Sequence, residues 1–142
     1  MPTSREDVRA LFLQLEEAMN TRQLDQLDDI LAPGFVRHCQ ATPQVVVNSR
    51  EDFVEFLRQD TAMFPDNVQT FQHVVVDGDM AGFWATYEGT QTGQMGPFPP
   101  SGKRASFDFA GVARIEDGRF AELWITWDNM TILGQLGHLP VD

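Results

Sequence analysis

Basic residues are scarce in this 142-residue chain, which has ten Lys and Arg against 21 Asp and Glu and a formal net charge of −11. Lys103 is the only lysine, and no Lys or Arg stands between positions 59 and 102. A surface that follows a phosphate backbone is built largely from these two residue types. We therefore expect neither nucleic acid nor an anionic membrane as a partner.

Cysteine and long hydrophobic runs are also in short supply. Cys39 is the only cysteine, which excludes an intrachain disulfide and a zinc site made of several thiolates. No hydrophobic run approaches the roughly 18 residues of a membrane span. The opening residues Met1 to Asp7 lack the hydrophobic core of a signal peptide, so the predicted location is cytoplasmic. The length predicts a single domain over residues 1–142.

Aromatic residues, by contrast, are plentiful: 11 Phe and three Trp accompany one Tyr. Such a load in a small domain predicts either an aromatic core or a hydrophobic cavity lined with rings.

Hydrophobic residues recur at helical spacing in three N-terminal segments. Ser4 and Ser49 each precede an Asp by three residues, which predicts a capped helix start at both. Thr21 is expected to cap a second, short helix that Pro33-Gly34 ends, and Pro65 is expected to end the third helix. The buried face of the third helix is predicted to hold Phe53, Phe56, Leu57 and Met63.

The second half of the chain has the alternation of strands. Four strands are expected at residues 70–76, 80–91, 104–115 and 119–128, after a small edge hairpin of residues 35–39 and 44–47. Asp77-Gly78 and Asp117-Gly118 predict tight hairpin turns, and the Gly- and Pro-rich loop 92–102 is expected at a rim. Helices followed by an antiparallel meander predict an α+β fold with helices on one face of the sheet.

The last predicted strand is hydrophobic on both of its faces. Three helices can cover only one side of a sheet, so the other side predicts association with further copies of the chain, most simply a twofold homodimer and otherwise a higher homo-oligomer.

Asp128 ends this strand on the same face as Trp124. A carboxylate shielded by such rings is suited to general acid/base chemistry. The alternative is that Asp128 only caps the turn that follows, and spacing leaves both interpretations open. His38 on a short strand is a second candidate for proton transfer or for orienting a carbonyl. The chain has no P-loop, dinucleotide fingerprint or HExxH pair, and its histidines are too scattered in sequence to predict a metal site.

The chain resembles the SnoaL-like polyketide cyclases, also called ester cyclases, of the nuclear-transport-factor-2-like superfamily. The resemblance rests on short phrases spread over nearly the whole chain: Phe35-Val36-Arg37-His38, Phe64-Pro65-Asp66, Val76-Asp77-Gly78-Asp79, Glu88-Gly89-Thr90-Gln91-Thr92-Gly93, Pro100-Ser101-Gly102-Lys103, Arg114-Ile115-Glu116-Asp117-Gly118-Arg119, Glu122-Leu123-Trp124 with Asp128, and Gln135-Leu136-Gly137.

The resemblance implies a cone-shaped α+β barrel, in which a curved antiparallel sheet wraps around the N-terminal helices and leaves a hydrophobic pocket, usually in a dimer. It also implies an intramolecular aldol closure without metal or cofactor, with an aspartate after the Glu-x-Trp phrase as acid and base. Asp128 matches that position. Gln91 departs from the family, many members of which carry His there, and Gln can orient a carbonyl but cannot titrate.

The leading hypothesis is a cofactor-independent cyclase, of lyase or isomerase type, for a hydrophobic, carbonyl-rich small molecule. Asp128 would be the acid/base, and His38 and Gln91 would orient carbonyl oxygens. The predicted substrate-binding residues are Trp124, Phe35, Trp84, Phe53, Met95 and Tyr87. The alternatives are an isomerase or hydrolytic rearrangement enzyme of the same fold, and a non-catalytic module for small-molecule binding or assembly.

Overall fold

The computed structural model describes residues 4–139. Residues 1–3, part of the segment expected to lack a signal peptide, lie outside the described residues. The helices are α1 (Arg5–Asn20), α2 (Leu27–Ile30), α3 (Arg50–Met63) and α4 (Asn129–Leu136), with a 3₁₀ turn, η1, at Leu24–Gln26. The strands are β1 (Leu31–Cys39), β2 (Val68–Asp77), β3 (Met80–Thr90), β4 (Arg104–Glu116) and β5 (Arg119–Trp127). Within the described range, no helix combines the length and hydrophobicity needed to cross a bilayer.

The five strands form one curved, unclosed sheet in the order β1-β5-β4-β3-β2. The meander β2 to β5 is antiparallel as predicted, but β1 pairs with β5 in parallel, so the sheet is mixed rather than antiparallel. The reason is that α3, and not a tight turn, connects β1 to the meander, which removes the constraint that makes hairpin strands antiparallel. The predicted α+β class is confirmed.

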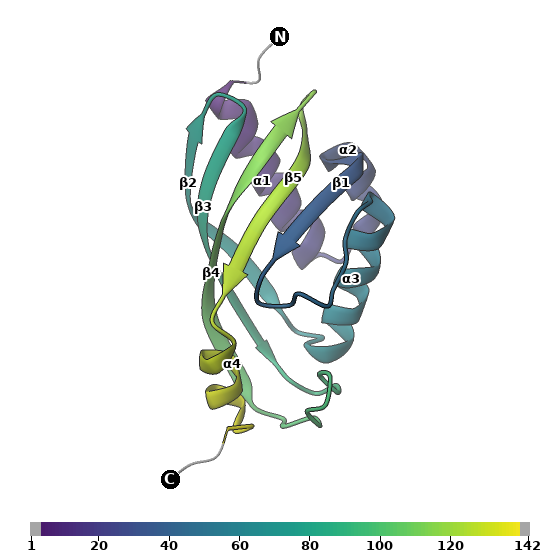
Figure 1. The fold of residues 1–142 in the computed structure, drawn as a ribbon, viewed down its shortest axis with the longest axis vertical. Coiled ribbons are helices and arrows are strands. Elements are labelled where there is room, and N and C mark those ends of the chain that lie inside the picture. The colour runs from purple at the N-terminus through teal and green to yellow at the C-terminus, as the bar shows by residue number, and fades with distance from the viewer. Residues whose placement is uncertain (1–3, 140–142) are drawn as a thin grey trace.

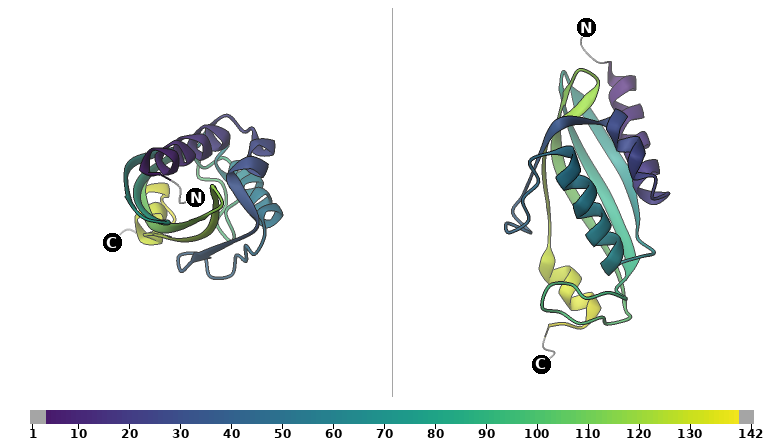
Figure 2. Two further views of the ribbon diagram at one scale, coloured as in Figure 1. Left: turned by 90° about the horizontal axis from the view of Figure 1, so that it is seen from above. Right: turned by 90° about the vertical axis from the view of Figure 1, so that its right-hand side faces the viewer.

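The helices α1 and α3 lie on the concave side of the sheet, and α4 lies at the far end of β5 (Figures 1 and 2). Phe12 of α1 is almost fully buried, and its ring centroid lies 5.0 Å from those of Phe71 and Phe120 and 5.5 Å from that of Phe83. Such edge-to-face and tilted contacts are the favoured geometry for aromatic rings. Part of the aromatic load therefore forms the core between α1 and the sheet.

Both predicted serine caps are present. The Ser4 hydroxyl accepts a hydrogen bond from the Asp7 amide at 3.1 Å, and the Ser49 hydroxyl accepts one from the Asp52 amide at 3.1 Å. Each cap satisfies an N–H group that the first helical turn leaves without a backbone partner.

The second predicted helix is present as a 3₁₀ turn and one α-helical turn over residues 24–30, but its predicted cap and its predicted end are both wrong. Thr21 is the C-cap of α1, α2 is one turn long, and Pro33-Gly34 lies inside β1 instead of ending a helix. The pairing of β1 with β5 shifts register between Leu31 and Val36, so the Pro and Gly occupy an irregular stretch of an edge strand. Pro is tolerated there because no ladder hydrogen bond needs its missing N–H.

The two predicted hairpin turns are confirmed, with positive φ at Gly78 and at both Asp117 and Gly118. The predicted edge hairpin shrinks to a single bridge between Arg37 and Val47. Helix α4 is not predicted by the sequence: only a turn is expected after Asp128, whereas eight helical residues follow it.

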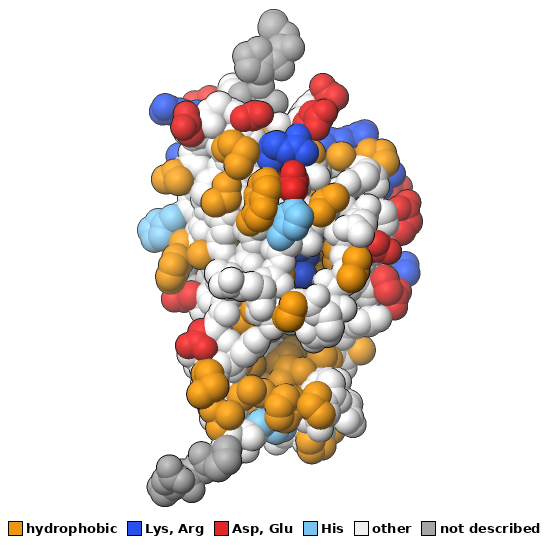
Figure 3. All heavy atoms as spheres, in the orientation of Figure 1, with side chains coloured by type: hydrophobic (Ala, Val, Ile, Leu, Met, Phe, Trp, Pro, Cys, Tyr) orange, Lys and Arg blue, Asp and Glu red, His pale blue; other side chains and the backbone are white. Residues whose placement is uncertain are grey.

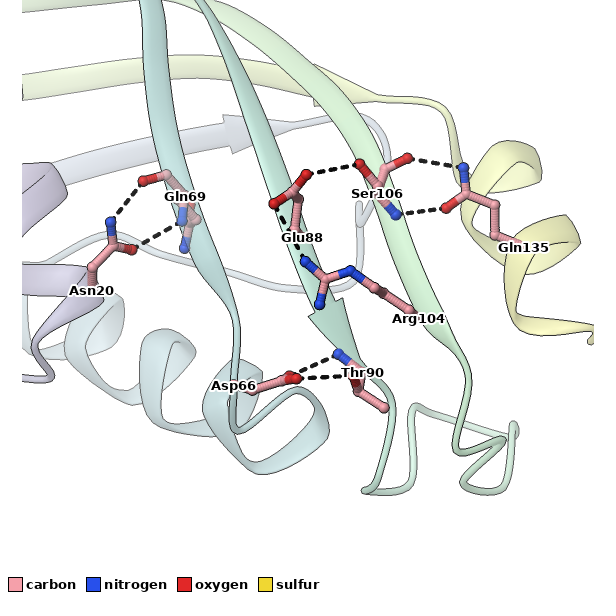
Figure 4. A network of polar contacts seen from close by, with 8 residues as sticks. All are labelled: Asn20, Asp66, Gln69, Glu88, Thr90, Arg104, Ser106 and Gln135. Carbon is pink, nitrogen blue, oxygen red and sulfur yellow. Dashed lines mark hydrogen bonds and ion pairs between the residues drawn. The ribbon is translucent and has the colours of Figure 1, made fainter.

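Side-chain amides attach the helices to the sheet (Figure 4). Gln135 of α4 accepts from the Ser106 amide at 2.7 Å and donates to the Ser106 carbonyl at 2.8 Å. Asn20 at the end of α1 makes the same pair of bonds with Gln69 of β2, at 2.8 and 2.9 Å. Each side-chain amide thus bonds both the N–H and the C=O of one strand residue, as a neighbouring strand would. These bonds fix the position of each helix against the sheet.

The convex face of the sheet carries exposed hydrophobic side chains, as predicted. Trp84 is 48% exposed, and Trp124 and Val112 are each 39% exposed. In Figure 3, hydrophobic side chains gather on this face beside basic, acidic and histidine side chains. The homodimer expected from this face stays a prediction.

Candidate active site

A cavity of about 520 Å³ lies on the concave side of the sheet. Its volume falls within the range of small-molecule sites. Its wall is mostly aromatic and aliphatic and includes residues of α1, α3 and α4, all five strands and the loop 92–102. Figure 3 shows a hollow walled by hydrophobic side chains toward α4. The polar side chains of the wall are Arg37, Thr42, Gln44, Gln59, Asp60, Gln69, Tyr87 and Asn129.

Asp60 is the only carboxylate in this wall within the described residues. It follows Phe53, Phe56 and Leu57 at helical spacing, so α3 presents it on the same side as the rings that bury the helix. The Tyr87 hydroxyl donates to its two carboxylate oxygens, at 3.0 and 3.1 Å. Burial raises the pKa of Asp60 to about 6, against the opposing effects of the Tyr87 hydrogen bond and of the charges on Arg22 and Arg37.

Tyr87 comes from the concave face of β3. Its ring stacks on Phe107 at 5.0 Å and meets the edge of Phe64 at 5.6 Å. Burial, followed by the charge of Asp60, raises the pKa of Tyr87 well above its ordinary value. Tyr87 is therefore a protonated donor throughout the physiological range, and it fixes the orientation of the Asp60 carboxyl.

Arg37 of β1 is the only basic side chain in the wall within residues 4–139. It is 5% exposed, and its guanidinium lies 4.2 Å from the ring centroid of Phe56 and 5.6 Å from that of Trp127. Burial lowers the pKa of Arg37 from its ordinary value, although an arginine stays charged in proteins. The cavity wall thus holds one carboxyl group and one positively charged guanidinium among hydrophobic side chains.

Asp128 does not face this cavity, contrary to the prediction. Its carboxylate is exposed and caps α4, accepting from the Met130 amide at 2.9 Å and from the Thr131 hydroxyl at 3.0 Å. Its neighbour Trp127, the last residue of β5, lines the cavity because successive strand residues point to opposite faces. Asn129, the first residue of α4, lines the cavity as well. Asp128 therefore occupies a helix-capping position, which is the second of the two interpretations that the sequence leaves open.

Three further candidates lie on the convex face and not in the cavity. The His38 imidazole is 2.6 Å from the Glu122 carboxylate and stacks on Trp124 at 5.3 Å. The hydrogen bond with His38, together with Arg114, holds the pKa of Glu122 below its usual range. Trp84 and Trp124 are exposed on the same side. Strand alternation places each of them opposite to a neighbour that lines the cavity, namely Arg37, Phe83 and Leu123.

Gln91 also lies outside the cavity wall, and its polar atoms are already used. It is fully buried and donates to the carbonyls of Gly93 and Pro99, both at 3.1 Å. Its side-chain oxygen is 2.7 Å from a ring nitrogen of His138. Gln91 therefore anchors the loop 92–102 and has no free group for a substrate carbonyl.

The other four predicted binding residues line the cavity: Phe35, Phe53, Met95 and Tyr87. Sequence reasoning missed Asp60 and Arg37. The signal for Asp60 was its place seven residues after Phe53, and that for Arg37 was its place two residues after the buried Phe35 on a strand. Within residues 4–139, no three His, Cys, Asp or Glu side chains form a group that could hold a metal ion.

Comparison with known proteins agrees with this architecture. A family profile described as SnoaL-like polyketide cyclase matches residues 9–136, so the chain belongs to the SnoaL-like polyketide cyclase family. No curated protein matches it.

Solved structures from three Streptomyces species are similar to it. TsrD from Streptomyces laurentii is 30% identical, with a TM-score of 0.86 over 96% of this chain and 98% of that one. IdmH from Streptomyces antibioticus, provisionally described as a polyketide cyclase, is 30% identical, with a TM-score of 0.81 over 91% and 97%. AclR from Streptomyces galilaeus, provisionally described as a hydroxylase, is 25% identical, with a TM-score of 0.82 over 96% and 100%.

The raised pKa of Asp60 predicts a specific dependence of stability on pH. Between about pH 4 and 6 the folded protein keeps a proton that the unfolded chain has lost, so the free energy of unfolding attributable to Asp60 falls as pH rises through this window. The fall is at most about 3 kcal/mol. Asp60→Asn removes this pH-dependent contribution. Urea unfolding at several pH values should therefore show that the free energy of unfolding of the wild type falls, relative to that of the variant, as pH rises.

The exposed Asp108 of β4 supplies the matched control. Asp108→Asn makes the same chemical change on the convex face, where the carboxylate accepts from the Thr86 hydroxyl at 3.0 Å. A stability difference between wild type and Asp60→Asn that stays constant from about pH 4 to 7 would contradict the assignment.

Proposed function

We propose that this protein is a cyclase that closes a ring in a hydrophobic, carbonyl-rich small molecule, with Asp60 as the general acid and base. Membership of the polyketide cyclase family supports the reaction class. The observation that carries the residue assignment is a carboxyl in a hydrophobic cavity, with a pKa of about 6 and a hydrogen bond from Tyr87. A catalytic pKa near the working pH lets one group both take and return a proton.

The reaction balances with the groups that the cavity supplies. The Asp60 carboxylate removes a proton from a carbon flanked by carbonyl groups, and the electrons of that C–H bond form an enolate. The enolate carbon attacks a second carbonyl of the same molecule, which forms the C–C bond and leaves an alkoxide. The Asp60 carboxylic acid then protonates the alkoxide, so the enzyme returns to its starting state and the product is an isomer of the substrate. These steps require no cofactor.

Tyr87 and the aromatic wall are positioning groups in this scheme. The Tyr87 hydroxyl holds the carboxyl in one orientation, and stacking on Phe107 holds the Tyr87 ring. The hydrophobic wall disfavours the carboxylate and so strengthens it as a base when it is ionised. The resemblance to the family assigns the acid/base role to Asp128 instead, and the two carboxylates can be tested against each other.

Replacing each carboxyl by an amide distinguishes them. Asp60→Asn should lower kcat by about a hundredfold or more, because general acid/base catalysis contributes on this scale. Asp128→Asn should keep most of the activity, because Asn caps a helix about as well as Asp. The assay is a panel of polyketide-like β-dicarbonyl esters, with products of unchanged mass separated by chromatography.

Circular dichroism establishes that both variants are folded. Asp108→Asn makes the same chemical change at the protein surface and serves as the matched control. Full activity of Asp60→Asn would overturn the Asp60 assignment. Loss of activity only in Asp128→Asn would assign the reaction to the family position.

We also propose that the protein is a homodimer through the convex face of its sheet. The exposed rings of Trp84 and Trp124 and the exposed Val112 support this, since patches of this kind are typical of interfaces. In sedimentation velocity, the wild type should behave as a dimer and Trp124→Glu should shift it toward the monomer. Leu13→Glu changes an exposed residue on α1, 60% exposed, and should leave the dimer intact. A monomeric wild type would refute the proposal.

A further inference from the structure

Two polar groups in the cavity wall have no hydrogen-bond partner among residues 4–139. The Nη1 atom of Arg37 and the hydroxyl oxygen of Thr42 are both buried without a hydrogen bond. Both residues line the same cavity, Arg37 from β1 and Thr42 from the segment that follows it. Buried polar groups are normally satisfied, and an unpaired charged donor is the costliest exception. Each atom therefore lacks a hydrogen-bond partner that a ligand in this cavity could supply.

The carboxylate already in the cavity does not fill this role. Both oxygens of Asp60 accept from Tyr87, and the raised pKa of Asp60 shows that burial outweighs the charge of Arg37. No carboxylate among residues 4–139 forms an ion pair with Arg37; the pairs of that region involve His38, Arg50, Arg58, Arg104 and Arg114. The positive charge of Arg37 is therefore unmatched at short range.

Arg37 has a side-chain hydrogen bond with Cys39, but its Nη1 atom has no partner among the described residues. The rings of Phe56 and Trp127 lie within cation–π distance of the guanidinium, at 4.2 and 5.6 Å. A ring that contacts the face of a guanidinium leaves its N–H groups free in the plane, where a carboxylate can bind two of them at once. The same rings offer a hydrophobic surface to the body of a ligand.

We propose that Arg37 and Thr42 bind a carboxylate of the substrate, so that the cavity selects hydrophobic, aromatic carboxylic acids over their neutral analogues. This assignment rests on the proposed function, whose substrate class it narrows. Arg37 is a specificity-determining residue, separate from the proton-transferring Asp60. A neutral carbonyl would leave the buried charge without a counterion, which is why a carboxylate fits the site better.

Binding of 2-naphthoate and of its neutral isostere 2-naphthamide tests the proposal. At about pH 7 the naphthoate is ionised, and both ligands present the same ring system to the wall. By isothermal titration calorimetry the wild type should bind naphthoate at least about tenfold more tightly than the amide. Arg37→Gln should abolish this preference and leave the affinity for naphthamide little changed.

Two further variants keep the test decisive if Arg37→Gln is poorly folded. Thr42→Val removes only the hydroxyl and should lower the preference for naphthoate severalfold. Arg37→Lys keeps the charge without the planar fork and should retain part of the preference. Absence of naphthoate binding to the wild type, equal affinity for the two ligands, or an unchanged preference in both Arg37→Gln and Thr42→Val would overturn the proposal.

Asp60→Asn separates this inference from the proposed function. Binding is measured without turnover, so Asp60→Asn should still prefer naphthoate over naphthamide. If that preference is present while Asp60→Asn keeps full cyclase activity, only the catalytic assignment fails. If Asp60→Asn abolishes turnover while no variant affects the preference, only the carboxylate site fails.

Discussion

The desolvation of one carboxyl group is the interaction on which the account of this protein depends. Asp60 stands among the phenylalanines of α3, where its charged form loses the hydration that it would have in water. The hydrogen bond from Tyr87 stabilises the charged form and so offsets part of the effect of burial. The net result is a pKa of about 6 for Asp60. A carboxyl on the exposed side of the same helix would have no reason to retain a proton near neutral pH.

The fold supplies the conditions for this desolvation. The concave side of the sheet faces α1 and α3, and the aromatic side chains on that side enclose a cavity instead of closing into a continuous core. Gln91 fixes the loop, and Gln135 fixes α4 against β4. Hydrogen bonds far from the carboxyl thus keep the cavity wall in place. Gln91 therefore contributes to the shape of the cavity although it lies outside the cavity wall.

The sequence predicted the elements better than it predicted the site. Serine caps, Asp-Gly turns and strand alternation are local signals, and they placed α1, α3 and the meander correctly. Pro33-Gly34 misled because its effect depends on tertiary context: the pair ends a helix in isolation but fits an irregular edge strand. The parallel pairing of β1 is likewise set by a long-range crossover that no local pattern encodes.

The position of Asp128 outside this cavity could not be predicted for the same kind of reason. Both faces of β5 are hydrophobic, so alternation could separate Asp128 from Trp127 but could not tell which of the two faces the cavity. Helical periodicity does not single out Asp60, because the pattern that predicts the buried face of α3 is carried by hydrophobic residues, whereas Asp60 shares their spacing without their chemistry. A polar residue that interrupts a hydrophobic stripe breaks the local folding pattern, and such positions are often functional.

The most direct test of the central claim is the titration of Asp60 itself. Carbon-13 NMR of the side-chain carboxyls, with the Asp60 resonance assigned from its loss in Asp60→Asn, measures its pKa in the folded protein. Burial of Asp60 among hydrophobic side chains predicts a pKa of about 6. A pKa near the ordinary aspartate value of about 3.9 would contradict it.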